Sequence, residues 1–206
     1  MKRLLEIIPG ALLWLTLLLA TILSFVRPIW AIYFIILFDL LWLFRVLYFV
    51  VFLLIASRRY HETVKTDWFL RVKERPRWER IHHLIFLPTY KESLPILRST
   101  FESLRVVTYP KEKFIIVLAG EERDREHFLE NARALADEFG DVFGQILVTV
   151  HPAGLPDEIP GKGSNINYAG HRAQELVDEL GIPYEDVIVS SFDVDTCVHL
   201  QYFAYL

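Results

Sequence analysis

Two long apolar stretches at the amino terminus limit the folds open to this chain more than any other feature. Residues 4–26 and 29–56 are almost wholly apolar, and each exceeds the roughly 20 residues that a helix needs to cross a bilayer core. Arg27 and Pro28 separate them as a tight turn. The pattern predicts a transmembrane helical hairpin. A cleaved signal peptide is the alternative for the first stretch, but a second span follows it at once and no convincing small-residue cleavage site is present.

Basic residues flank the hairpin on one side. Lys2 and Arg3 precede the first stretch and the pair at residues 58–59 follows the second, whereas the turn carries only Arg27. The positive-inside rule therefore predicts a multi-pass membrane protein in which both ends of the hairpin are cytoplasmic. The single cysteine, Cys197, permits no internal disulfide, which agrees with a reducing compartment for the part outside the membrane.

The second stretch contains two ionisable residues, Asp39 and Arg45. They are six positions apart and so lie on different helix faces, which makes them poor partners for each other. One interpretation is that Arg45 snorkels to the interface. The other is that these residues pair with neighbouring helices.

Charge is distributed unevenly along the chain. Residues 1–59 hold six basic and two acidic side chains, whereas residues 60–206 hold 16 and 24, a net charge of −8. An acidic domain is a poor candidate for nucleic-acid binding, so we expect no nucleic-acid partner. A phosphate-bearing ligand would need local positive charge or a metal ion.

Residues 60–83 form a mixed segment between the hairpin and the rest of the chain. It contains Trp68, Phe69 and Trp78 among several basic residues. We expect it to lie along the membrane surface with its aromatic rings toward lipid and its basic groups toward lipid phosphates; an ordinary linker helix is the alternative. His82 and His83 lack the spacing of metal ligands and are expected to be surface or interfacial residues.

From residue 84 onward, short apolar runs alternate with amphipathic stretches. The runs span residues 84–87, 114–118, 146–150 and 187–189, and helical patterns of apolar residues lie between them. This alternation predicts an α/β fold with a parallel sheet and crossover helices. Ligands of such sheets bind at the carboxyl ends of the strands. The chain there carries Pro88-Thr89-Tyr90, Gly120-Glu121, His151 and Asp193-Val194-Asp195.

Asp193 and Asp195 follow the fourth predicted strand with one residue between them. Alternate side chains of an extended segment point the same way, so the pair can present two carboxylates to one cation. Mg²⁺ and Mn²⁺ prefer oxygen ligands and are often shared with substrate phosphates. The pattern predicts a divalent metal site; an acidic turn after a strand is the alternative.

The segment PGKGSNINYAG, residues 160–170, places Lys162 between two glycines at a helix start. Backbone N–H groups, the helix N-terminus and one lysine can together hold a diphosphate. The segment does not match the phosphate loop of nucleotide triphosphatases, because Ser164 does not directly follow Lys162. No G-x-G-x-x-G follows the first strand either, which argues against a dinucleotide fold. A glycine-rich helix start is the alternative.

The segment LPTYKES, residues 87–93, closes the first predicted strand. Thr89 and Tyr90 lie where a base or ribose could stack and form hydrogen bonds. Glu92 could do the same or favour the helix start. A proline turn with a helix cap is the alternative.

Taken in chain order, these segments resemble the inverting family 2 glycosyltransferases of the GT-A fold, a group that includes cellulose and hyaluronan synthases. IFLPTYKES is similar to that family's first-strand motif, GKGSNIN to its Gly-Lys-x-x-x-x-Asn segment, and FDVDT to its Asp-x-Asp motif. The resemblance implies a Rossmann-like nucleotide-sugar-binding domain over residues 84–206. It would follow a hairpin at residues 1–59 and an interfacial linker at residues 60–83.

The resemblance also implies a reaction and a set of site residues. The donor would be a UDP-sugar or GDP-sugar, and the acceptor a lipid-linked or polysaccharide molecule at the bilayer. Lys162 would approach the diphosphate, Asp193 the ribose or a metal-bound water, and Asp195 would hold Mg²⁺ or Mn²⁺. The donor-binding residues implied in this way are Pro88, Thr89, Tyr90, Glu92, Glu121, Lys162, Asn165 and Asp193, and the metal ligands are Asp195 and Asp193.

The chain departs from the family pattern in two places. Ala119 stands where the family has an aspartate on the base, and Glu121 or Glu122 could substitute. The family's catalytic base and Gln-x-x-Arg-Trp motif lie beyond Asp-x-Asp, so we expect them past Leu206. The chain is then the amino-terminal part of an enzyme and lacks the acceptor and catalytic-base part. A non-catalytic membrane-tethered nucleotide-sugar-binding or assembly module is one alternative. A nucleotidyltransferase is another, although residues 88–90 do not supply the glycine-rich phosphate motif that it needs.

Overall fold

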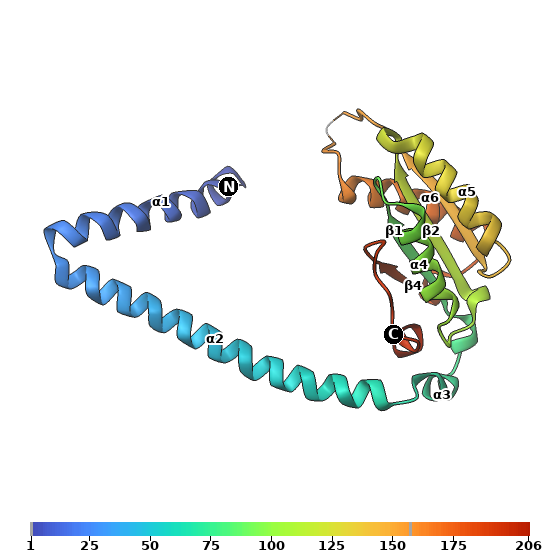
Figure 1. Cartoon of the computed structure of the whole chain (residues 1–206), viewed down its shortest axis with the longest axis horizontal. Helices are drawn as coiled ribbons and strands as arrows, with labels where there is room; N and C mark the ends of the chain where they lie inside the picture. Colours follow the sequence, from blue (N-terminus) through green and yellow to red (C-terminus); the bar gives the residue numbers. More distant parts are fainter. Residues whose placement is uncertain (1, 157) are drawn as a thin grey trace. The chain divides into compact units, whose positions relative to one another are not determined.

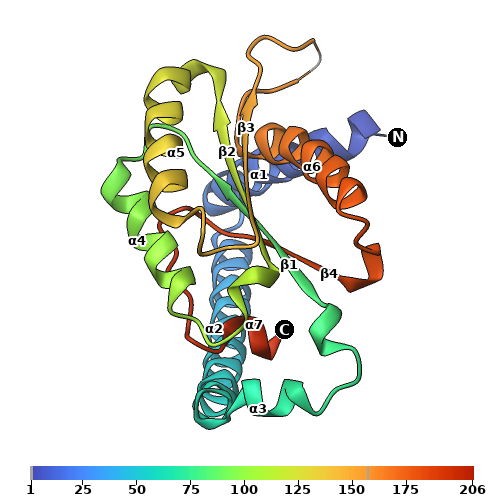
Figure 2. The ribbon, with the colours of Figure 1, turned by 90° about the vertical axis from the view of Figure 1, so that its right-hand side faces the viewer.

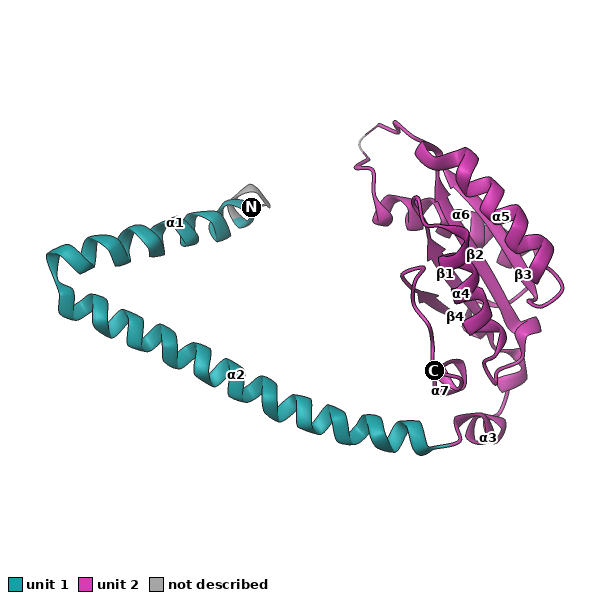
Figure 3. Cartoon of the chain, in the orientation of Figure 1, with its two compact units in different colours: residues 1–66 teal, residues 67–206 magenta. Residues whose placement is uncertain are grey.

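The structure of the protein is a computed structural model that describes residues 2–156 and 158–206. The chain divides into two compact units, Met1–Thr66 and Asp67–Leu206 (Figure 3). The first unit is purely helical and the second is an α/β unit.

The helical unit is a hairpin of two helices, α1 (Lys2–Val26) and α2 (Pro28–Lys65) (Figure 1). Arg27 breaks the helical path with φ −147° and ψ 77°, and Pro28 then opens α2, where its missing N–H costs nothing. Leu5–Val26 and Pro28–Lys65 each contain an 18-residue window of high mean hydropathy, 2.1 in the first and 2.4 in the second, and both helices are long and apolar enough to cross a membrane. Most apolar side chains described in this unit are exposed, as lipid-facing residues are.

The second helix continues to Lys65, beyond the apolar stretch that ends at residue 56. No helix breaker intervenes, and the Thr66 hydroxyl donates to the carbonyl of Glu62 at 2.9 Å. With 38 residues, α2 is about 57 Å long, which exceeds a bilayer core of about 30 Å. Within α2, the Arg45 guanidinium lies 5.4 Å from the centroid of the Trp42 ring.

Four parallel strands form the sheet of the second unit, which confirms the predicted α/β architecture. They are β1 (His82–Pro88), β2 (Phe114–Glu121), β3 (Gln145–His151) and β4 (Val187–Ser191), in the order β3-β2-β1-β4. The two central strands are buried almost throughout, as their continuous apolar sequences predict.

Helices cover both faces of the sheet. Figure 2 shows α4 (Leu94–Arg105) and α5 (Arg125–Phe139) on one side and α6 (Lys162–Glu179) on the other. Ile85 and Leu87 of β1 pack under α4 and α5, whereas Leu84 and Phe86 face α6. The strand's two-residue period thus divides one apolar run between two core layers. The short elements are α3 (Trp68–Lys73), η1 (Trp78–Arg80), η2 (Lys111–Lys113), η3 (Glu122–Asp124), η4 (Tyr184–Asp186) and α7 (Tyr202–Tyr205).

The aromatic residues of the segment after the hairpin pack into the α/β unit. Trp68 meets Tyr205 edge-on with ring centroids 4.7 Å apart, and Phe69 meets Trp78 at 5.8 Å. The Trp78 ring also contacts Tyr109, a core residue. These three rings therefore cover the protein core, whereas the sequence led us to expect them on lipid.

His83 is fully buried, which corrects the expectation of a surface position. Strand β1 begins at His82, two residues before the predicted start, so His83 lies inside the sheet. Its ring meets Tyr109 edge-on at 4.6 Å and Phe203 at 5.0 Å between centroids. Burial and then the neighbouring His82 lower the pKa of His83 to about 4. The imidazole is therefore neutral in the folded protein near neutral pH.

Gly120 allows the close approach of α5 to the end of β2. A Cβ at this position would overlap the ring of Phe128, whose Cδ2 lies 2.6 Å away, and that ring is 3% exposed. We expect Gly120→Ala to destabilise the α/β unit by about 2 kcal/mol, because an overpacked core must displace its neighbours. Denaturant unfolding followed by tryptophan fluorescence measures this loss.

Gly170→Ala is the matched control. Gly170 lies in α6, and a Cβ there would meet nothing within 4 Å. Since alanine favours a helix over glycine by about 0.5–1 kcal/mol, this variant should be as stable as the parent or more so. Equal loss of stability in both variants would contradict the packing argument.

Candidate functional site

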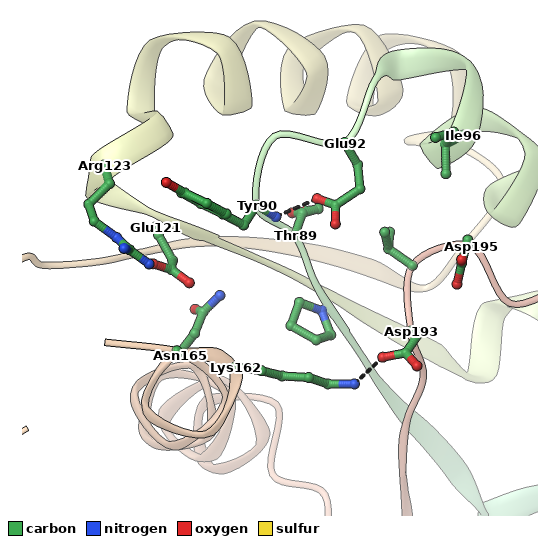
Figure 4. A pocket seen from close by; sticks show the side chains of 13 residues that line it. Thr89, Tyr90, Glu92, Ile96, Glu121, Arg123, Lys162, Asn165, Asp193 and Asp195 are labelled. Atoms are coloured by element: carbon green, nitrogen blue, oxygen red, sulfur yellow. Dashed lines mark hydrogen bonds and ion pairs between the residues drawn. The ribbon is translucent and has the colours of Figure 1, made fainter. Parts of the chain in front are cut away.

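The loops that follow β1, β2 and β4 meet the start of α6 around one cavity of about 450 Å³ (Figure 4). The nine donor-binding and metal-binding residues that the family resemblance implies all line it: Pro88, Thr89, Tyr90, Glu92, Glu121, Lys162, Asn165, Asp193 and Asp195. They come together because the strands are parallel, so that their carboxyl ends share one edge of the sheet. Ile96, Arg123, Gly161 and Val194 complete the wall.

The loop after β1 is fixed by contacts from η3 and α5. Lys91 has a left-handed backbone with φ 68°, and its N–H donates to Asp124 Oδ2 at 3.0 Å. The side-chain amide of Asn131 donates to the carbonyl of Glu92 at 3.2 Å, and the Glu92 carboxylate accepts the N–H of Tyr90. Glu92 thus shapes the loop that carries Tyr90 into the cavity.

One end of the cavity combines an aromatic ring with an ion pair. The Arg123 guanidinium lies 4.6 Å from the centroid of the Tyr90 ring, and its Nε donates to Glu121 Oε2 at 2.9 Å (Figure 4). The hydrogen bond with Glu121 raises the pKa of Arg123. Stacking on a ring and pairing with a carboxylate both suit a guanidinium. We did not predict Arg123 from the sequence, because it belongs to no motif and the ring that it contacts, Tyr90, lies 33 residues earlier in the chain.

Two buried polar atoms on the cavity residues have no hydrogen-bond partner within the described part of the chain. They are Thr89 Oγ1 and Asn165 Oδ1, on side chains that are 5% and 1% exposed. The amide nitrogen of Asn165 donates to the carbonyl of Ala119 at 2.8 Å, which fixes the orientation of the side chain. Buried polar atoms of native proteins are nearly always paired, and both of these atoms are shielded from solvent in this structure, so a ligand can reach them only if the cavity wall shifts.

The amino end of α6 borders the cavity at Gly161 and Lys162. The Ser164 hydroxyl donates to the carbonyl of Gly161 at 2.8 Å and accepts the N–H of Gly161 at 3.2 Å. Lys162 is the first residue of the helix, where backbone N–H groups are unpaired and the helix dipole is positive. An anionic group can be held here by the helix end and the lysine together.

The ammonium group of Lys162 forms an ion pair with the carboxylate of Asp193 (Figure 4). Both side chains are largely exposed, at 50% and 72%, so the pair contributes little to stability. A ligand that binds Lys162 or Asp193 more strongly than they bind each other can therefore replace this ion pair.

The Asp193–Asp195 segment is a turn, whereas we expected an extended segment. The N–H of Thr196 donates to the carbonyl of Asp193 at 2.9 Å, and Val194 is buried between the two exposed aspartates. No group of three acidic, histidine or cysteine side chains within the described residues could enclose a metal ion. Asp193 and Asp195 both line the cavity and would offer carboxylate oxygens to a Mg²⁺ or Mn²⁺ ion, for which water and ligand phosphates would be the other ligands.

The second strand brings its acidic group to the cavity at its last residue, Glu121, two residues after Ala119. Ala119 is fully buried and packs toward α6, so Glu121 is the residue that brings a carboxylate to the cavity.

His151, at the end of β3, lies outside the main cavity. It contacts Glu158 at 3.1 Å between Nε2 and Oε2, in a smaller cavity of about 90 Å³ that shares Glu121 and Arg123 with the first.

No family model matches the chain, and no curated protein sequence matches it. Among solved structures, a match is the mannosyltransferase PcManGT from Pyrobaculum calidifontis in complex with GDP-Man and Mn2+. The two chains are 18% identical and superpose with a TM-score of 0.42 over 73% of this chain and 41% of that chain. The chain thus spans less than half of the length of that structure's chain.

Proposed function

We propose that this chain is the donor-binding part of a membrane-anchored glycosyltransferase that takes a UDP-sugar or GDP-sugar. The observation that supports this most is the cavity itself. A ring platform at Tyr90, a helix N-terminus with Lys162 and an Asp-x-Asp loop all face one space of about 450 Å³. These are the three kinds of group that a base, a diphosphate and a divalent cation require.

In this proposal the nucleoside binds at the end of the cavity that Tyr90 and Glu121 form. A base stacks on the face of the Tyr90 ring that the Arg123 guanidinium leaves open, and Thr89 and Asn165 line the same cavity. The Glu121 carboxylate is held by Arg123 and can accept a further hydrogen bond. Pro88 and Glu92 shape the loop.

The diphosphate binds between Lys162 and the Asp193–Asp195 loop. Lys162 exchanges its contact with Asp193 for a phosphate oxygen, which frees the Asp193 carboxylate. Asp195 and Asp193 would hold Mg²⁺ or Mn²⁺, which when bound stabilises the negative charge on the departing diphosphate. This arrangement explains how an acidic unit binds an anion.

The proposal assigns donor binding to this chain and no catalytic base. Transfer with inversion needs a base that deprotonates the acceptor hydroxyl. Each of the four acidic side chains that line the cavity has another role in this proposal: Glu92 accepts from Tyr90, Glu121 pairs with Arg123, and Asp193 and Asp195 would hold the cation. We therefore expect donor binding without sugar transfer to a lipid-linked or polysaccharide acceptor.

We further propose that α1 and α2 cross the bilayer and that both ends of the hairpin are cytoplasmic. Their length and apolar composition support the crossing. The excess of basic residues beside Lys2 and Arg58, against Arg27 alone in the turn, supports the orientation.

Nucleotide titration of the full chain in lipid nanodiscs tests the proposed function. UDP should bind about tenfold more tightly than UMP, and GDP about tenfold more tightly than GMP, because only the diphosphates carry a second phosphate group for Lys162 and the helix end. Isothermal titration calorimetry in the presence of Mn²⁺ measures these affinities. Equal affinity for mono- and diphosphates would count against a diphosphate site.

A further inference from the structure

A patch of four cations lies on α3 and the turn that follows it. Its members are Arg71, Lys73, Arg75 and Arg77, here called the α3 basic patch. All four side chains are exposed, and none forms an ion pair with a residue that the structure describes. Arg80, which follows the patch, differs because it pairs with Asp186 at 2.8 Å.

The packing of α3 determines which side of the α/β unit carries the α3 basic patch. Trp68, Phe69 and Val72 are partly buried against the core of the α/β unit, so the basic side chains are left on the solvent side of the helix. The Arg71 guanidinium lies 5.2 Å from the centroid of the Trp68 ring, and Lys73 Nζ lies 4.4 Å from that of Phe69. These contacts restrain two of the four cations while leaving them accessible.

Arg71 and Arg75 line a surface hollow of about 360 Å³ together with Glu74. Two guanidinium groups around one hollow suit a phosphate group, which arginine binds through paired N–H donors. Glu74 opposes an anion in this hollow, and the neighbouring Lys73 and Arg77 outweigh it. The hollow therefore offers the donor groups that a phosphate requires.

The α3 basic patch is positively charged, whereas the rest of the α/β unit is strongly acidic. Residues 81–206 carry ten basic and 20 acidic side chains, a net charge of −10. Several of these arginines, such as Arg98 and Arg172, form ion pairs with glutamates. An anionic surface thus repels most of this unit and attracts the α3 basic patch.

We propose that the α3 basic patch binds the phosphate headgroups of anionic phospholipids in the membrane that α2 enters. Trp68 follows Lys65, the last residue of α2, by three positions, which limits their separation to about 10 Å. The aromatic rings of this segment cover the protein core, so its attachment to lipid is electrostatic and depends on salt. The proposal rests on the bilayer crossing proposed above for α2 and is independent of the proposed sugar chemistry.

Hydrogen–deuterium exchange of the full chain in nanodiscs tests this inference. Backbone amides of residues 68–77 should exchange several-fold more slowly in discs that contain phosphatidylglycerol than in discs of phosphatidylcholine alone, and high salt should remove the difference. Arg71→Gln with Arg75→Gln should abolish the slowing, since losing two basic groups weakens attraction to an anionic surface roughly 30-fold. Glu74→Gln should strengthen it.

Arg125→Gln with Arg133→Gln, two exposed arginines of α5, is the matched control and should behave as the parent does. Exchange rates that are the same in both kinds of disc would overturn the proposal. So would slowing that survives in the Arg71 and Arg75 variant. Inorganic phosphate, added to phosphatidylcholine discs, forms a separate arm, and slowing there equal to that of phosphatidylglycerol would assign the hollow to a soluble phosphate instead.

Discussion

A Lys162→Met variant is expected to bind UDP and GDP about 100-fold more weakly than the parent chain. The variant keeps the aliphatic stem and removes the ammonium group that faces Asp193 across the cavity. A hydrogen bond to a charged group contributes about 1.5–3 kcal/mol, which corresponds to this change in affinity. Calorimetric titration of the full chain in nanodiscs measures it.

Arg172→Met is the matched control for that experiment. Arg172 lies on the same helix and pairs with Glu175, away from the cavity. It should bind both nucleotides as the parent does. A Lys162→Met variant whose affinity falls no further than that of the control would remove Lys162 from the diphosphate site.

Acid should destabilise the α/β unit through His83, by about 3 kcal/mol between pH 7 and pH 4. The pKa of His83 falls from 6.5 to about 4 in the folded protein because the ring is buried. As the pH drops below 6.5, His83 of the unfolded chain binds a proton, whereas His83 of the folded protein stays neutral until about pH 4. Stability is therefore complete above the unfolded pKa and is lost through this window, at about 1.4 kcal/mol per unit.

His83→Phe isolates this effect from the titration of carboxylates. The ring nitrogens of His83 have no hydrogen-bond partner among the described residues, and Tyr109, Phe114 and Phe203 surround the ring, so an aromatic side chain can replace it. Denaturant unfolding at several pH values should show a shallower loss of stability in this variant. Parallel pH profiles for variant and parent would show that His83 does not carry the acid sensitivity.

Local patterns in the sequence predicted most of the fold. The four apolar runs correspond to β1 to β4, and the two central strands, which are buried almost throughout, have the continuous apolar sequences expected of parallel strands covered on both faces. The residues at the carboxyl ends of β1, β2 and β4 meet at one cavity because the topology places those ends together. The ligand roles of these residues remain predictions.

The parts that the sequence did not predict depend on distant contacts. Lys91 and Asp124 are 33 positions apart, and Asn131 and Glu92 are 39 positions apart. No local sequence pattern therefore indicates the two hydrogen bonds that fix the loop after β1. Trp68 contacts Tyr205, which lies near the other end of the unit in the sequence. Its ring therefore packs against the protein core, whereas we expected it to face the membrane. His83 was misplaced because its strand begins two residues earlier than the apolar run.

The central claim is that the cavity binds a nucleotide diphosphate together with a divalent cation at the Asp-x-Asp loop. Titration of the parent chain, Asp195→Asn and the control Asp141→Asn with UDP and GDP, with and without Mn²⁺, tests it most directly. Asp141 is an exposed acid in the turn before β3 and lines neither cavity at the carboxyl edge of the sheet. We expect Mn²⁺ to tighten binding about tenfold in the parent and in Asp141→Asn, because the cation bridges carboxylate and phosphates, and to have no effect in Asp195→Asn. Diphosphate binding that is indifferent to Mn²⁺ in all three chains would contradict the claim.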